Sequence, residues 1–201
     1  MKLHRLLAVV ALGIVLAASC KSAKKTSQDS GRKKDPVAAE AALRIGIMLD
    51  KLATALIDAT KGKADIVRTA DGINIAFQPD FYFESSSDKL TSGAKGVLEN
   101  VSGVLNEYPY TEIFIEGHAD SSGNQLVNKK LSENRAKAVA LYLKSNGVLA
   151  ERMAIAGYGA TKPVESNATP EGRKKNRRVV VKIRANEKKF LEAKSSVAVG
   201  K

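Results

Sequence analysis

The sequence has few of the residues from which metal and redox sites are built. Its 201 residues include one cysteine and two histidines, which excludes an internal disulfide and leaves too few soft ligands for a zinc site or an iron–sulfur cluster. Tryptophan is absent and aromatic residues make up only 5% of the chain, so no series of base-stacking side chains is indicated. We therefore expect no metal and no other cofactor.

The positive charge of the chain is gathered near its two ends. The formal net charge is +12, of which residues 21–35 contribute +4 and residues 171–201 contribute +8. This division favours an anionic surface or partner over a continuous nucleic-acid groove, and we expect no nucleic acid to bind. The hydrophobic fraction of 44% and the charged fraction of 27% are ordinary for a folded domain.

Residues 1–19 are predicted to form a secretory signal. Two basic residues precede the thirteen apolar residues Leu6–Ala18, a run shorter than the ~20 residues that span a bilayer as a helix. The run continues into Leu16-Ala17-Ala18-Ser19-Cys20, which resembles a bacterial lipoprotein lipobox. This resemblance implies that Cys20 receives a lipid and becomes the first residue of the mature chain. Residues 20–35 are then the lipidated cysteine and a flexible basic linker.

Residues 36–72 are expected to form an N-terminal helix and the first strand of a hairpin. The apolar side chains that recur at helical spacing in this region are Ile45, Met48, Leu49, Leu52, Leu56 and Ala59, and Gly62 supplies a stop. Such a stripe must pack on the domain that follows or on a second copy of the chain. A homo-oligomer through helix 36–60 is therefore one of two alternatives.

The rest of the chain predicts an α/β (α+β) two-layer sandwich in which helices cover one face of a mixed sheet. The expected elements are a hairpin around Ala70-Asp71-Gly72, a helix from about residue 94 to Pro109, a helix over about 128–146, and strands at 112–116, 153–156 and 179–183. From the second hairpin strand onward, their order is βαβαββ. Residues 185–201 lack periodicity and are expected to be a frayed basic tail.

A series of spaced motifs runs through this region. The motifs are Gly117-His118-Ala119-Asp120-Ser121-Ser122-Gly123, Asn128, Leu131-Ser132, Arg135-Ala136, Gly157-Tyr158-Gly159, Pro163, Asn167-Ala168-Thr169, Gly172-Arg173 and Asn176-Arg177-Arg178-Val179. Together they resemble the OmpA-like peptidoglycan-binding domain, over residues 73–184. The resemblance implies a non-enzymatic lipoprotein of the outer membrane, whose domain faces the periplasm and binds the diaminopimelate of the stem peptide.

The resemblance also assigns peptidoglycan contacts to Asp120, Asn128 and Arg135. The free end of diaminopimelate carries an ammonium and a carboxylate on one carbon, so a fixed anion and a planar guanidinium are the groups that recognise it. Asp120 and Arg135 take these roles by the family motif. Asn128, placed at the start of the predicted helix, either contacts the peptide or caps the helix.

Arg135 stands out from its position alone. Leu131, Arg135, Val139 and Leu143 form one i, i+4 row of the predicted helix, and an unpaired charge along an apolar stripe is costly. Asp120 is the nearest carboxylate in the predicted connectivity. A structural ion pair between Asp120 and Arg135 is therefore an alternative to ligand binding, and the two roles are compatible.

Two other functions use the same motifs. A wall hydrolase would pair His118 or Glu116 with Asp120, but the sequence has no nucleophile elbow to accompany either pair. A stator-like envelope protein would need a transmembrane helix at the N-terminus, which Leu6–Ala18 is too short to provide. We expect His118 to pack beside the sheet instead.

Overall fold

The computed structural model describes residues 36–84 and 87–199. The predicted signal segment, Cys20 and the basic linker lie outside these ranges. Within them, no helix combines the length and the apolar character that a bilayer crossing requires.

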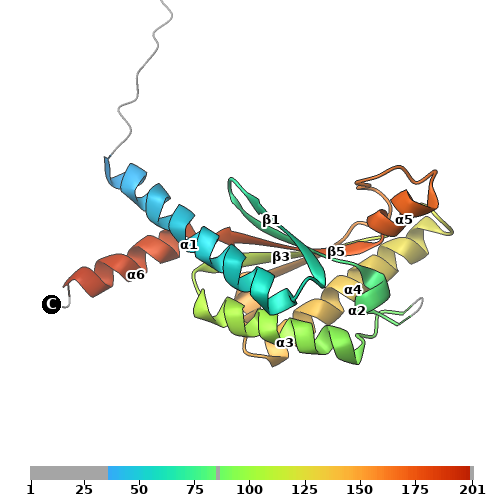
Figure 1. The fold of residues 1–201 in the computed structure, drawn as a ribbon, viewed down its shortest axis with the longest axis horizontal. Coiled ribbons are helices and arrows are strands. Elements are labelled where there is room, and N and C mark those ends of the chain that lie inside the picture. Colours follow the sequence, from blue (N-terminus) through green and yellow to red (C-terminus); the bar gives the residue numbers. More distant parts are fainter. Residues whose placement is uncertain (1–35, 85–86, 200–201) are drawn as a thin grey trace, which may run out of the picture. The chain divides into compact units, whose positions relative to one another are not determined.

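The domain is built on one mixed sheet of five strands (Figure 1). In spatial order these are β1 (Ala64–Thr69), β2 (Gly72–Phe77), β5 (Arg178–Ala185), β3 (Thr111–His118) and β4 (Met153–Gly157). Only β3 and β4 run parallel, and every other neighbouring pair is antiparallel. The last strand of the chain therefore occupies the middle of the sheet.

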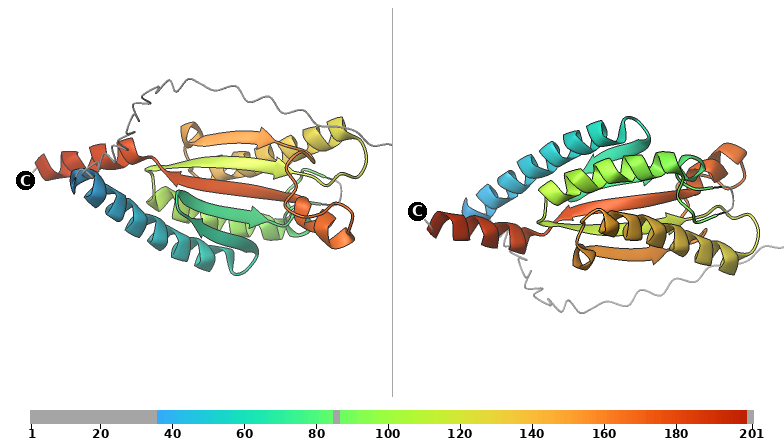
Figure 2. Two further views of the ribbon diagram at one scale, coloured as in Figure 1. Left: turned by 90° about the horizontal axis from the view of Figure 1, so that it is seen from above. Right: turned by 90° about the horizontal axis from the view of Figure 1, so that it is seen from below.

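Three long helices cover one face of this sheet (Figure 2). They are α1 (Pro36–Thr60), α3 (Ser92–Glu107) and α4 (Gln125–Ser145). Two short helices, α2 (Pro79–Tyr82) and α5 (Pro170–Asn176), lie in the connections. The predicted two-layer sandwich of a mixed sheet and helices is confirmed, whereas the sequence pattern did not indicate α2 and α5.

Strand alternation places the core between the sheet and the helices. The three inner strands β2, β5 and β3 align so that Ile73, Ile183 and Ile113 lie side by side, and Ile75, Val181 and Ile115 form the next row. All six are fully buried. The intervening residues point to the helix-free face, where side chains of both charge signs occur.

The apolar stripe of α1 belongs to this core. Leu52 and Leu56 are fully buried and Leu49 is 2% exposed, and the helix packs against α3 and β1. Of the two alternatives left by the sequence, the structure shows packing on the chain's own domain. Self-association would have to use the other side of α1, where Leu43, Ile47 and Ile57 are exposed.

The expectation of a frayed tail is wrong, because Glu187–Val199 form helix α6. The side chain of Asn186 accepts a hydrogen bond from the backbone N–H of Lys189, as an N-cap does. Phe190 is 6% exposed, and its ring meets that of Tyr110 edge-on at 6.5 Å. The cap and the buried Phe190 are among the contacts that hold this helix, and neither produces a periodic apolar pattern in the sequence.

His118 is buried on the helix-free face, beside the sheet as expected. It is 3% exposed, and its ring stacks on that of Tyr158 with 5.5 Å between the centroids. Burial, reinforced by the positive charge of Arg178, lowers the pKa of His118 to about 4. The imidazole is therefore neutral at physiological pH.

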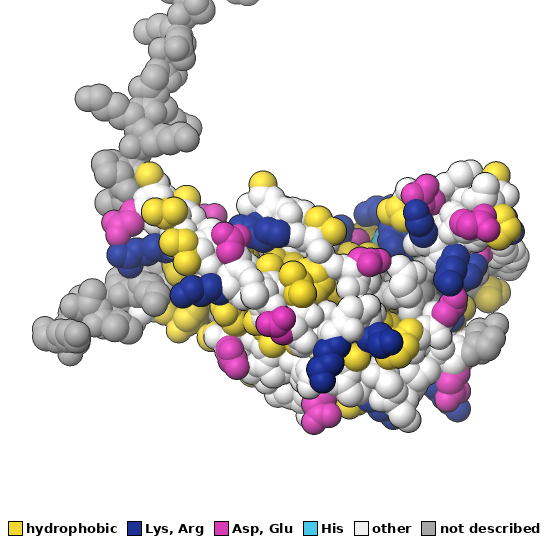
Figure 3. All heavy atoms as spheres, viewed as in Figure 1, with side chains coloured by type: hydrophobic (Ala, Val, Ile, Leu, Met, Phe, Trp, Pro, Cys, Tyr) yellow, Lys and Arg dark blue, Asp and Glu magenta, His cyan; other side chains and the backbone are white. Residues whose placement is uncertain are grey.

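On the face seen in Figure 3, basic and acidic side chains are interspersed over the described surface. The basic excess of the chain does not form a continuous belt across this face.

Replacing Leu52 by Ala should lower the free energy of unfolding by about 2–5 kcal/mol, because it leaves a cavity where α1 meets the core. Ile57→Ala, on the exposed side of the same helix, should change it by less than about 0.5 kcal/mol. Urea denaturation followed by circular dichroism measures both. Equal effects of the two substitutions would contradict the packing of α1 described above.

The free energy of unfolding should fall as the pH drops from about 6.5 to about 4. In that window the unfolded chain protonates His118 while the folded chain does not, so stability is lost as protons bind the unfolded state. We expect a loss of about 1–2 kcal/mol between pH 7.5 and pH 5. His118→Phe keeps a ring against Tyr158 and should remove this part of the pH dependence, and an unchanged dependence in that variant would contradict the assignment.

Candidate functional site

Asp120 lies in the loop after β3, where its carboxylate is fixed by two hydrogen bonds. The Nη1–H of Arg177 donates to Oδ2 at 2.8 Å, and the backbone N–H of Ser122 donates to Oδ1 at 2.8 Å. Burial of Asp120 favours the neutral acid, but the hydrogen bonds and the charge of Arg177 outweigh it and hold the pKa below its ordinary value. Asp120 is therefore a fixed anion at neutral pH.

Asn128 ties this loop to α4. Its Nδ2–H donates to the backbone oxygens of Ser122 at 2.7 Å and of Asp120 at 3.2 Å. The alternative that Asn128 caps the helix is wrong, because α4 begins one turn earlier. Its N-cap is Asn124, whose Oδ1 accepts hydrogen bonds from the first turn.

Arg135 lies about two helical turns after Asn128 on α4 and is 8% exposed. Its Nε–H donates to the backbone oxygen of Ser87 at 2.9 Å, and its guanidinium lies over the ring of Phe83 at 5.1 Å. These contacts attach α4 to the loop before α3. Burial lowers the pKa of the guanidinium and the positive charge of Arg177 lowers it further, against the opposing effect of the carboxylates of Asp80 and Asp88.

The predicted ion pair between Asp120 and Arg135 does not form. Asp120 pairs with Arg177, and within the described ranges no carboxylate oxygen lies within 4.0 Å of Arg135. The α4 row carries Arg135 toward the loop that contains Ser87, while the start of β5 brings Arg177 against Asp120. Arg135 is thus a buried cation whose Nε–H donates to a neutral carbonyl.

Arg177, in the motif Asn176-Arg177-Arg178-Val179, is the partner of Asp120. It follows the last residue of α5 and precedes β5, and its side chain is on the opposite side of the chain from that of Arg178. Arg178 is 8% exposed and donates to the backbone oxygens of Asn176 and Lys162. The side chains of these adjacent arginines therefore point to opposite sides of the chain, as the alternation of side chains along extended backbone predicts.

Two glycines let α4 approach the ends of β3 and β4. A Cβ at Gly117 would lie 1.9 Å from the backbone oxygen of Ser132, and a Cβ at Gly157 would lie 2.6 Å from the backbone of Glu133. No side chain fits at either position without displacing the helix. The contact fixes the depth at which α4 presents Asn128 and Arg135 to the Asp120 loop.

The pairs required for the hydrolase alternative are not assembled. The Asp120 carboxylate faces Arg177, and the Nε2 of His118 lies 3.6 Å from Oε2 of Glu116 rather than beside Asp120. Both ring nitrogens of His118 are buried without a hydrogen-bond partner among the described residues. The buried, neutral imidazole therefore does not form the pair with Asp120 that the hydrolase alternative requires.

Comparison with known proteins identifies related chains. Residues 82–177 match the model of the OmpA family. The chain is 35% identical to the probable lipoprotein YiaD of Escherichia coli, covering 69% of this chain and 64% of that one. It is 31% identical to the outer-membrane lipoprotein YfiB of Pseudomonas aeruginosa, covering 57% of this chain and 68% of that one.

A third relative shares the domain within a longer protein. The peptidoglycan-binding protein ArfA of Mycobacterium tuberculosis is 42% identical, covering 43% of this chain and 27% of its own length. The matched region is thus less than two thirds of YiaD and about a quarter of ArfA.

Solved structures show the same fold. A MotB-like protein from Desulfovibrio vulgaris superposes with a TM-score of 0.65 at 21% identity, covering 73% of this chain and 94% of that one. The cell wall anchor of the type VI secretion system (T6SS) from Pseudomonas aeruginosa superposes with a TM-score of 0.60 at 29% identity, covering 67% and 96%. With the family model and the match to YfiB, these comparisons lead to one conclusion: the chain belongs to the OmpA family.

Proposed function

We propose that the domain binds peptidoglycan through the diaminopimelate of the stem peptide and, through a lipid on Cys20, tethers the outer membrane to the cell wall. The domain would face the periplasm. Relatives named as a peptidoglycan-binding protein and as an outer-membrane lipoprotein support the ligand and the location. As an OmpA-family domain, the protein is non-enzymatic.

One observation carries the ligand assignment: the buried Arg135 has no carboxylate oxygen within 4.0 Å among the described residues, and the positive charge of Arg177 is near enough to lower the pKa of its guanidinium. A buried charge without a counter-ion is costly, and so is the repulsion between like charges. A ligand carboxylate placed between Arg135 and Arg177 would remove both costs. The bidentate geometry of a guanidinium suits such a carboxylate.

Asp120 supplies the complementary charge. Its carboxylate accepts one hydrogen bond at each oxygen in the structure, and each oxygen keeps a second lone pair. The ligand ammonium can therefore join Arg177 at Asp120 without displacing it. One carbon that carries an ammonium and a carboxylate would satisfy Asp120 and the two arginines together.

Asn128 is not the N-cap of α4, and we assign it two other roles. Because its amide N–H groups hold the backbone of Asp120 and Ser122, it fixes the loop that carries the anion. Its Oδ1 is the atom left to accept a hydrogen bond from a peptide N–H of the ligand. We propose that Asn128 both positions the loop and contacts the stem peptide.

Arg135→Lys should weaken binding to purified sacculi by roughly tenfold or more, on the order of 1.5–3 kcal/mol, because it keeps the charge and loses the two-pronged geometry. A sedimentation assay with sacculi, with free diaminopimelate as competitor, measures the loss.

Arg152→Lys is the matched control for this experiment. Arg152 is also buried, at 7% exposure, but it donates to the backbone oxygens of Leu105, Tyr108 and Thr111, away from the site. Its replacement should lower stability and leave binding unchanged. If Arg135→Lys lowers the melting temperature but binds sacculi as tightly as the wild type, Arg135 is a structural residue and the proposed site is wrong.

Cys20→Ser should abolish labelling by a fatty acid and release the protein from the membrane fraction, because no described helix can span the bilayer. Metabolic labelling followed by fractionation tests this. Labelling that persists in the variant would contradict the proposed anchor, and leaves the peptidoglycan assignment to be judged by the sacculus assay.

A further inference from the structure

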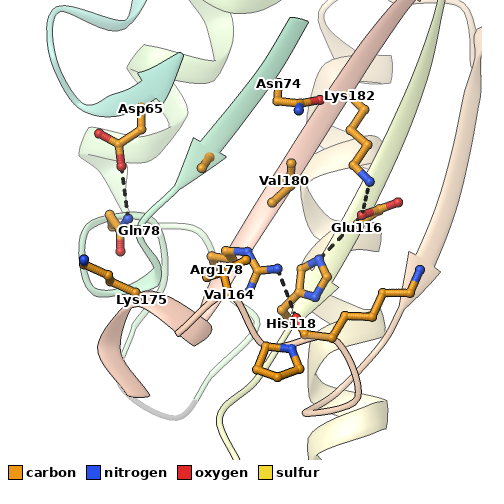
Figure 4. Close-up of a pocket in the computed structure, with 13 residues that line it drawn as sticks. Asp65, Asn74, Gln78, Glu116, His118, Val164, Lys175, Arg178, Val180 and Lys182 are labelled. Carbon is orange, nitrogen blue, oxygen red and sulfur yellow. Dashed lines mark hydrogen bonds and ion pairs between the residues drawn. The ribbon is translucent and has the colours of Figure 1, made fainter. Parts of the chain in front are cut away.

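The helix-free face of the sheet contains a cavity of about 510 Å³ that the proposed stem-peptide site does not use (Figure 4). Its lining comes from β1, β2, β5 and β3, from the loop after β4, and from α5. A volume of this size is typical of sites for small ligands.

The lining of this cavity carries more positive than negative charge. It contains two carboxylates and four cations, and the cations are Lys162, Lys175, Arg178 and Lys182. Lys182 pairs with Glu116 at 2.8 Å, and Lys175 pairs at 3.2 Å with Glu165, which is not part of the lining. The other two cations have no carboxylate oxygen within 4.0 Å among the described residues. The cavity therefore favours an anionic ligand over a neutral one.

Arg178 is the buried cation of this lining. It is 8% exposed and lies beside His118 in the register of β5 and β3 (Figure 4). Its Nη1–H donates to the backbone oxygen of Asn176 and its Nη2–H to that of Lys162, both at 3.2 Å. A guanidinium has five N–H groups, so three remain for which no described residue is an acceptor. An anion in the cavity can accept these hydrogen bonds and balance the buried charge.

His118 senses the positive charge of the cavity. Burial lowers its pKa to about 4, and the positive charges of Arg178 and Lys182 contribute to the lowering, against the carboxylate of Glu116. The neutral imidazole adds no charge of its own to the lining. Because an anion at Arg178 would change the electric field at the adjacent ring, the His118 signal reports on the occupation of the cavity.

Two lysines lie at the open rim of the cavity, where they can turn toward an anion. Lys162 is exposed, and its ammonium lies 3.5 Å from the centroid of the Tyr158 ring. Lys175 and its partner Glu165 have side-chain exposures of 63% and 48%, so their ion pair contributes little. Reorienting either ammonium toward Arg178 therefore costs little free energy.

The carboxylate of Asp65 lies away from these cations. It is on β1, and β2 separates β1 from the strand that carries Arg178. It accepts a hydrogen bond from the neutral amide of Gln78 at 3.3 Å. The positive end of the cavity is therefore at β5, α5 and the loop after β4.

We propose that this cavity binds a small organic ligand through a phosphate monoester, which lies at Arg178 and is enclosed by Lys162 and Lys175. A phosphate monoester carries about 1.5 to 2 negative charges at pH 7 and has three strong acceptor oxygens. It therefore matches one guanidinium and two ammonium groups better than a carboxylate, which has two oxygens and a single charge.

The carbon skeleton of the ligand has an apolar surface to lie on. Ala76 and Val180 are paired across β2 and β5 in the middle of the cavity, and Pro163 and Val164 line it from the loop. Val164 is 58% exposed, so this surface is open to a ligand. An organic phosphate would bury it while the phosphate balances the cations.

This site is separate from the proposed stem-peptide site. Arg177 pairs with Asp120, whereas Arg178 lines the cavity on the other side of the chain. The inference therefore does not rest on the proposed binding of diaminopimelate. An Asp120→Asn variant should bind the phosphate ligand as the wild type does, so the two proposals can fail independently.

Nuclear magnetic resonance of the full chain at pH 7 tests the proposal, because the sequence has only two histidines. In a background of His4→Gln and Cys20→Ser, the chain carries no lipid and His118 gives a single imidazole signal. The probe is glycerol 3-phosphate, with acetate at equal ionic strength as the carboxylate control. We expect saturable shifts of the His118 signal and of the backbone amides of Val164 and Arg178 with the phosphate and not with acetate.

Vesicles distinguish a soluble phosphate from the phosphate of a lipid. Phosphatidic acid in phosphatidylcholine presents a phosphate monoester, and the same fraction of phosphatidylglycerol presents a diester. Flotation with phosphatidic acid vesicles that glycerol 3-phosphate competes away would assign the phosphate to a lipid. Saturable binding of glycerol 3-phosphate without such flotation would assign it to a soluble molecule.

Lys162→Glu combined with Lys175→Glu should weaken the binding of glycerol 3-phosphate by about tenfold or more, because two rim cations become anions. Both side chains are exposed, so the fold should be kept. Lys95→Glu combined with Lys137→Glu is the matched control, since these lysines are exposed on α3 and α4, outside the cavity, and the net charge changes equally.

Retained binding in the control and weakened binding in the rim variant would support the site. The proposal would be overturned by an absence of saturable shifts in the unmutated cavity, by equal shifts with acetate, or by unchanged binding in the rim variant.

Discussion

The close contact between α4 and the ends of β3 and β4 sets the geometry of the proposed stem-peptide site. At Gly117 and Gly157 the helix backbone occupies the space of a missing side chain, so the depth of α4 is defined by backbone against backbone. This kind of contact varies little, because no rotamer change can adjust it. This backbone contact therefore determines the positions of Asn128 and Arg135 on α4.

The proposed stem-peptide site has an excess of positive charge, because the guanidiniums of Arg135 and Arg177 accompany the single carboxylate of Asp120. The structure pairs Asp120 with Arg177 and leaves Arg135 in contact with a carbonyl and an aromatic face. Unbalanced charge within a folded protein is expected at a site where a bound ligand supplies the opposite charge. The cost to the free domain is limited because the guanidinium stacks on Phe83, which favours a cation over a ring face.

The sequence predicted the sheet core and the burial of Arg135 because both follow from local periodicity. The strands expected at 112–116 and 179–183 carry apolar side chains at alternate positions, Ile113 and Ile115 in one and Val181 and Ile183 in the other, and all four are buried. The partner of Asp120 could not be predicted in the same way, since it depends on which of several cations the fold brings near. Arg177 is 57 residues away along the chain, and the sequence gives no distance between them.

Local ambiguity explains the other differences. Asn124 and Asn128 are both suitable N-caps, and the choice between them moves the start of α4 by only one helical turn. Helix α6 depends on Asn186 and Phe190 rather than on a stripe, so a search for periodicity overlooks it. The stripe of Leu49, Leu52 and Leu56 shows that α1 has an apolar face, but it does not show which surface that face packs against. The packing of α1 on its own domain therefore could not be predicted.

The position of β5 has a consequence for folding kinetics. Its partners in β2 are more than a hundred residues earlier, as in the pair Gly72 and Arg184, so the sheet has a high contact order and we expect slow folding. Until β5 joins, β2 and β3 are unpaired edges of two separate half-sheets, β1–β2 and β3–β4. Such edges favour pairing with other chains. A nascent chain lacking β5 therefore remains unfolded and vulnerable to aggregation, and the closing step of folding is the insertion of its last strand.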